Sequence, residues 1–232
     1  MTIDLKKEQQ ASLERPPFPY TPMTRVFVAA MDVVAGRETS LAKAKMLEVL
    51  AGIPYHAWER REESRLPRRE AGLREACRGF IRWTQEARHN ENLHLEVLDE
   101  RMRELGLRDP WYLRQPARFG AAAFYAVFAN LLARIDMRRA FQFNAEFEDH
   151  AEHTYARFAA DHPEWDDEAV GGPAVAGYAA ETGSELASWG DVVRRIALDE
   201  RDHMNRSFIA CGMPEHVAEY QGMPERPAAA CD

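Results

Sequence analysis

The stretch NENLHLEV, residues 90–97, decides how the rest of this chain is interpreted. It places Glu91 and His94 three residues apart, so on a helix both side chains lie on one face. The same spacing occurs three times in the chain: Glu86/His89, Glu91/His94 and Glu200/His203. Because a short spacing also arises by chance, the position of each pair within the hydrophobic pattern must decide which pairs matter.

Apolar residues recur at steps of three and four through the helix predicted over residues 68–106, which is the period of a helix with one buried face. This apolar stripe is Leu73, Cys77, Phe80, Thr84, Ala87, Glu91, His94 and Leu98. Glu91 and His94 therefore occupy positions that a core side chain should fill. Glu86 and His89 fall off the stripe, and we expect them to be solvated.

Three other predicted long helices carry the same kind of interruption. The stripe near the C-terminus is Trp189, Val193, Ile196, Glu200, His203 and Ser207. The stripe of the helix predicted over 39–63 is Leu41, Ala44, Glu48, Ala51, Tyr55 and Trp58. The stripe of the helix predicted over 136–161 is Phe141, Ala145, Glu148, Ala151, Tyr155 and Phe158. Each helix thus directs one or two ionisable groups at the core, and alanines one turn away leave space beside them.

Four buried carboxylates in one core would be strongly unfavourable without positive charge between them, since a buried unpaired charge costs several kcal/mol. Two helices that give one Glu each and two that give Glu-x-x-His form the ligand set of ferritin-like di-iron and di-manganese carboxylate bundles. We therefore predict two metal ions, iron as Fe²⁺/Fe³⁺, with manganese substitution left open. The predicted ligands are Glu48, Glu91, His94, Glu148, Glu200 and His203.

Glycine and proline divide the chain into helical segments with no internal repeat and no alternation typical of strands. The segments are 23–35, 39–63, 68–106, 116–134, 136–161 and 186–211. We predict an all-α fold, a ferritin-like four-helix bundle with two additional shorter apolar helices. The predicted organisation is an irregular N-terminal arm over 1–22, the helical bundle domain over 23–212 and a C-terminal tail over 213–232, frayed at its end.

Composition excludes several classes of protein. A net charge of −8 argues against a nucleic-acid partner, and three widely spaced cysteines predict neither a disulfide framework nor a thiolate zinc site. The opening MTIDLKKEQQ lacks the apolar segment of a signal peptide, so we expect the protein in the cytoplasm or on the cytoplasmic face of the membrane. No apolar run is long enough to span a bilayer. The uncharged segment 119–133 instead predicts peripheral membrane contact or a homodimer interface.

Four motifs around the predicted ligands resemble those of the alternative oxidases, membrane-associated di-iron quinol oxidases. They are KAKMLEVLAGIP at 43–54, NENLHL at 90–95, FEDHAEHTY at 147–155 and LDERDH at 198–203. Their order also matches, and the resemblance covers residues from about 23 to 210. It implies the same six metal ligands, Tyr155 as the functional tyrosine, and Asn90 and Asp199 as residues that support the ligands. It also implies that Leu47, Phe147, Ala151 and Thr154 line a quinol pocket.

Outside the ligands the sequence departs from the family's pattern. Lys43 and Asn92 stand where the motifs have arginine, and His150 closes the usual acidic triplet. The family's His-Arg and Tyr-Trp pairs correspond to Phe141-Gln142 and Tyr178-Ala179. These changes concern the substrate pocket more than the metal ligands.

The first functional hypothesis is therefore a quinol oxidase that reduces O2 to water, with Tyr155 supplying an electron and a proton. The second is a soluble di-iron oxygenase or desaturase acting on a small organic substrate, with the same centre and a different pocket. The third is a metal-binding or iron-storage bundle, against which Tyr155 and the motif order argue.

Overall fold

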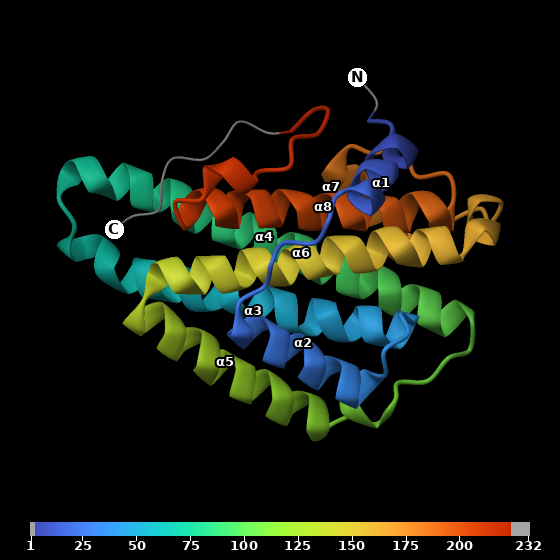
Figure 1. Cartoon of the computed structure of the whole chain (residues 1–232), viewed down its shortest axis with the longest axis horizontal. Helices are drawn as coiled ribbons and strands as arrows, with labels where there is room; N and C mark the ends of the chain where they lie inside the picture. Colours follow the sequence, from blue (N-terminus) through green and yellow to red (C-terminus); the bar gives the residue numbers. More distant parts are fainter. Residues whose placement is uncertain (1–2, 224–232) are drawn as a thin grey trace.

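The computed structural model describes residues 3–223, and over these residues it contains eight α-helices and no β-strand (Figure 1). The helices are α1 Leu5–Glu14, α2 Pro22–Ala35, α3 Leu41–Arg65, α4 Ala71–Glu104, α5 Ala117–Ile135, α6 Met137–Asp161, α7 Pro173–Thr182 and α8 Trp189–Ala210. The all-α prediction is confirmed. The six predicted helical segments are present as α2 to α6 and α8, with ends shifted by a few residues at most.

Four long helices, α3, α4, α6 and α8, run along the long axis of the molecule (Figure 1). Helix α3 packs on α4, and α6 packs on α8. The predicted stripes face the interior, and all their members are buried except Leu73, which is 42% exposed. Leu73 lies in the first turn of α4, where the start of α4 and the end of α3 together project beyond the other helices (Figure 1).

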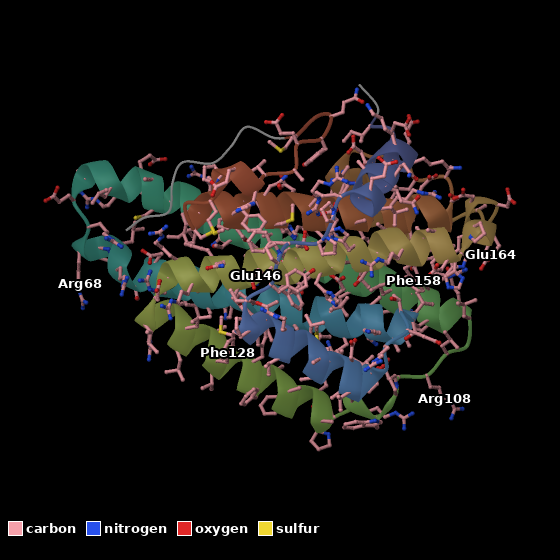
Figure 2. All side chains as sticks on the ribbon, in the orientation of Figure 1. Arg68, Arg108, Phe128, Glu146, Phe158 and Glu164 are labelled. Carbon is pink, nitrogen blue, oxygen red and sulfur yellow. The ribbon has the colours of Figure 1, made fainter. Side chains whose placement is uncertain are left out.

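Local sequence signals set where several of these helices begin. Ser40, Asp136 and Ser188 each accept a hydrogen bond from the backbone N–H three residues later, which satisfies one of the unpaired donors of a first helical turn. Charged side chains such as those of Arg68, Arg108 and Glu164 lie at the ends of the molecule, away from the core (Figure 2). The interior is left to the stripes and to the ionisable groups that interrupt them.

The predicted irregular arm over 1–22 is wrong for residues 5–14, which form α1. Asp4 caps this helix by accepting from the backbone N–H of Lys7. The buried residues of α1 are polar, Glu8 and Ser12, and they bond to Arg201 on α8. A helix buried through polar contacts has no apolar stripe, so its periodicity was invisible in the sequence.

Helix α7 lies outside the six predicted helical segments, in a stretch where GGP at 171–173 interrupts the helical pattern. Pro173 stands at its first position, where the missing N–H costs nothing, and Gly183 ends it with a positive φ of 61°. Of the predicted tail, residues 214–216 form a short 3₁₀ helix. Its predicted frayed end lies largely outside the described residues.

Helices α2 and α5 are the two predicted shorter apolar helices, and they lie side by side along one flank of the bundle (Figure 1). Helix α5 exposes Phe119, Phe124, Val127, Leu131 and Ile135. Tyr125 is instead buried, and Phe128 is half-buried against Phe143. Among the described residues, no helix is both long and apolar enough to cross a membrane.

Candidate metal centre

The six predicted ligands converge between the four long helices. Glu48 comes from α3, Glu91 and His94 from α4, Glu148 from α6, and Glu200 and His203 from α8. They form two adjacent groups whose ligand atoms lie within 4.8 Å of one another: Glu48, Glu91, His94 and Glu200; and Glu91, Glu148, Glu200 and His203. Glu91 and Glu200 belong to both groups. Two four-residue groups sharing two carboxylates suit a pair of metal ions.

The polar atoms of this cluster have few hydrogen-bond partners, although all six residues are buried. Within the described structure, both oxygens of Glu91 and of Glu200 have none, and neither do Oε2 of Glu148 and Nδ1 of His203. His203 Nδ1 lies 2.8 Å from Glu91 Oε1, yet without the geometry of a hydrogen bond. Atoms directed at a common point without bonding to each other fit a bound cation. Four carboxylates would be neutralised by two divalent ions.

The pKa values show how strongly the cluster requires positive charge. Burial, together with repulsion from Glu200, raises the pKa of Glu48 and of Glu148 well above the usual value. Burial opposes ionisation of Glu91 as well, but the histidines outweigh it and lower its pKa to about 2. Burial alone would lower the pKa of His203, yet Glu91 and Glu200 raise it. Without metal, protons on the imidazoles and carboxylates offset the negative charge.

Asp199 and Asn90, the two residues expected to support the ligands, lie behind the predicted ligand His94. Asp199 Oδ2 lies 3.2 Å from His94 Nε2, and it also accepts from Asn90 Nδ2 at 3.2 Å and from the Tyr178 hydroxyl. His94 Nδ1 is thereby directed at the carboxylates, 3.1 Å from Glu200 Oε1. Arg195 bonds the other oxygen of Asp199. A carboxylate on the far nitrogen of a histidine fixes the orientation in which that histidine binds a metal.

Two tyrosines donate to different carboxylates of the cluster. The hydroxyl of Tyr155 donates to Oε1 of Glu48 on α3, whereas the sequence only placed it on the same helix face as Glu148. Tyr55, a member of the predicted core stripe of α3, donates to Glu148 Oε1 at 2.8 Å. Asn144 also donates to that oxygen, at 3.0 Å. The sequence indicates this contact of Asn144 only through its position four residues before Glu148, which puts both side chains on the same face of α6.

A third group of possible ligands lies nearby, formed by Asp149, Glu152 and His153. Arg15 forms ion pairs with both carboxylates, and Arg201 bonds Glu152 at 2.8 Å. Cationic side chains therefore already occupy the place that a metal ion would take. We interpret this group as the anchor of the N-terminal segment, which includes α1.

Two separate hollows reach the cluster. A cavity of about 890 Å³ between α3, α4 and α5 extends to Glu48, and arginines including Arg60, Arg118 and Arg134 line it. A smaller pocket of about 250 Å³ extends to Asp199 and His203. The four positions of the implied quinol pocket line neither hollow: Leu47, Phe147, Ala151 and Thr154 are buried on α3 and α6.

Residues 20–209 match the alternative oxidase family. The match includes all six clustered residues, Tyr155 and Asp199, and it excludes α1. No protein of curated function matches the chain. The family consists of di-iron oxidoreductases, and the two ligand groups here could hold such a pair of metal ions. Because the match spans most of its length, this chain belongs to the alternative oxidase family.

Proposed function

We propose that this protein is a quinol oxidase that reduces O2 to water at two iron ions held by the six clustered residues. The observation that carries the proposal is the Tyr155 hydroxyl bonded to Glu48, a residue of one of the two ligand groups. The match to the alternative oxidases supplies the reaction class. A storage site has no need of a phenol at a ligand.

When bound, the two irons would supply O2 binding and the electrons for the first steps of its reduction. The residues of the chain provide the surroundings. Glu91 and Glu200 belong to both ligand groups, so each would help to hold the two ions. Asp199 holds the orientation of His94. The phenol of Tyr155 can give an electron, with its proton passing to Glu48, because the two groups are already hydrogen-bonded.

For the reductant we propose a quinol that arrives from the cytoplasmic face of a membrane. Helices α2 and α5 expose apolar side chains, among them Val33 at 86% and Phe124 at 75%. Burying such side chains in lipid is worth roughly 1.5–3 kcal/mol each. Leu47 and Phe147 pack in the same apolar cluster as residues of α2 and α5. A quinol bound against these helices would therefore be near Glu48 and Glu148, which directly follow Leu47 and Phe147.

The large cavity favours a second candidate, a di-iron oxygenase or desaturase acting on a small organic substrate. It reaches Glu48, and its arginines suit a substrate with an anionic group. A homodimer formed through α3, α4 and α5 would instead cover this cavity. The homodimer itself remains a prediction. Measuring the mass of the protein in solution distinguishes an open cavity from a covered one.

Oxygen uptake tests the proposal directly. Protein loaded anaerobically with ferrous iron should consume O2 continuously when a short-chain quinol is added, and water should be the product, without accumulating peroxide. Substitution of Tyr155 by Phe should end the quinol-dependent uptake while the iron content stays the same. The oxygenase would be favoured if iron-loaded protein consumed no O2 with any quinol but hydroxylated or desaturated an anionic organic compound.

Membrane delivery is tested separately with liposomes. Phe124→Asp together with Leu131→Asp should release the protein from liposomes without loss of iron, since both side chains are exposed on α5. Ala176→Asp together with Ala180→Asp adds two charges to exposed residues of α7, on the side of the bundle away from α5 (Figure 1), so it should leave binding intact. If the unsubstituted protein never binds liposomes, membrane delivery is wrong.

A further inference from the structure

A second tyrosine at the metal centre has no role in the function proposed above. Tyr55 is fully buried on α3, and its hydroxyl donates to Glu148 Oε1 at 2.8 Å. Asn144 Nδ2 lies 3.0 Å from both of these oxygens, so the phenol and the carboxylate are held together. Tyr155 makes the equivalent contact with Glu48 at the other ligand group. The two phenols therefore contact different ligand groups.

Beyond Tyr55 an aromatic cluster leads away from the ligands. Its ring lies 5.6 Å from the imidazole of His203, 5.9 Å from Trp83 and 5.4 Å from Trp58, between ring centroids. Trp83 forms part of the wall of the 250 Å³ pocket, which opens to solvent. Trp58 lines neither hollow and packs on Phe141 in the buried core. Of the two indoles in contact with Tyr55, Trp83 is the one that reaches a solvent-accessible surface in the described part of the chain.

Tyrosine and tryptophan are among the side chains most easily oxidised by one electron. A phenol bonded to a carboxylate can pass on its proton as it loses the electron, because the acceptor is already in place. The indole Nε1 of Trp83 has no hydrogen-bond acceptor within the described structure. An electron can therefore leave Trp83, whereas its proton has no neighbouring group to receive it.

We propose that Tyr55 and Trp83 form a one-electron relay from a small water-soluble reductant in the pocket to the metal centre, independent of Tyr155. The relay rests on the O2-reducing function proposed above. Tyr55 gives one electron to the centre after O2 has oxidised it, and its phenolic proton passes to Glu148 Oε1. Trp83 then gives one electron to Tyr55, which recovers that proton. A one-electron donor of the ascorbate class reduces Trp83, so one electron and no net proton cross the relay.

Electron paramagnetic resonance tests the tyrosine. Iron-loaded protein carrying Tyr155→Phe is mixed with O2 without reductant and frozen quickly, with and without ring-deuterated tyrosine. We expect a radical signal that narrows with the deuterated tyrosine and is lost on adding Tyr55→Phe. Tyr125→Phe is the matched control, because Tyr125 is equally buried and its hydroxyl has no partner in the described structure. An unchanged signal after Tyr55→Phe, at equal iron content, overturns the proposal.

The tryptophan is tested by adding ascorbate after the radical has formed. Trp83→Phe should slow the loss of the Tyr55 signal, whereas Trp58→Phe should not, although both indoles contact the same ring. Equal decay in the two variants overturns the relay. This comparison keeps the contact of Tyr55 with Glu148, so it decides the question even if Tyr55→Phe fails to bind iron.

Failure of the relay and failure of the proposed function give different results. Quinol-dependent O2 uptake is measured in parallel on iron-loaded protein that retains Tyr155. Normal uptake with no signal from Tyr55 refutes the relay alone. Iron-loaded protein that consumes no O2 with any donor refutes both.

Discussion

Replacing Asp199 by Asn should weaken metal binding, although Asp199 is not itself one of the predicted ligands. Burial opposes its ionisation, but Arg195, His94 and Tyr178 outweigh burial and hold the pKa of Asp199 well below the usual range. The side chain is therefore a carboxylate that accepts from His94 Nε2. An amide of the same shape removes the negative charge, so His94 becomes a weaker and less firmly oriented ligand.

The size of the effect follows from that single contact. Loss of a partner behind a ligating histidine typically costs about 10–100-fold in metal affinity, which is about 1.4–2.8 kcal/mol. At a fixed free iron concentration, the metal-dependent gain in stability falls by the same amount. A chain of this length shifts its melting temperature by about 2–4 °C per kcal/mol, so the iron-loaded variant should melt about 3–11 °C lower from this loss alone.

Anaerobic competition with a chelator for ferrous iron measures the affinity, and circular dichroism measures melting with and without iron. Asp202→Asn is the matched control, because Asp202 lies on the same helix and bonds Arg206 and Tyr220 but no ligand. We expect the control to bind iron normally. If Asp199→Asn also binds iron as the unsubstituted protein does, the contact with His94 does not support the metal site.

Three further results are expected. His94→Ala should deplete the metal, whereas His89→Ala should not, because His89 is exposed on the other side of α4. Equal metal depletion in the two variants, measured by metal analysis, would show that the ligand assignment is wrong. Metal binding should release protons near pH 7 and should weaken as the pH falls. The reason is that Tyr178 and nearby carboxylates raise the pKa of His94 despite its burial, and only neutral imidazoles bind metal. Calorimetry in buffers of different ionisation enthalpy measures the released protons, and binding without proton release would contradict this prediction. The folding stability of metal-free protein should have the opposite pH dependence. The stability that the raised pKa of His94 contributes is present below about pH 6.5 and is lost as the pH rises through the folded-state pKa. Arg15→Met should lower the free energy of unfolding by about 2–3 kcal/mol, which is less than the loss of a fully buried ion pair, because the carboxylate partners keep other donors and the Arg15 side chain is 25% exposed. Urea unfolding measures this change. The control is Arg78→Met, which breaks an exposed pair and should change the free energy by less than about 1 kcal/mol.

Periodicity alone located the six clustered residues. Glu48 and Glu148 interrupt apolar stripes, and so do the pairs that begin with Glu91 and Glu200. A helix repeats its face every 3.6 residues, so which side chains point inward is a local property that the sequence carries. The same reasoning correctly placed His89 on the surface.

The partners of those side chains are not local. Tyr55 and Glu148 are separated by 93 residues, and Arg201 and Glu8 by 193. In the sequence each of these residues is typical of a core tyrosine or a surface charge. Its hydrogen-bond partner depends on how separate helices pack against one another. Helix α1 was missed for that reason, since polar contacts with α6 and α8 hold it. Sequence therefore determined the long helices and the residues they direct inward, while packing decided which phenol contacts which carboxylate and which hollows reach the centre.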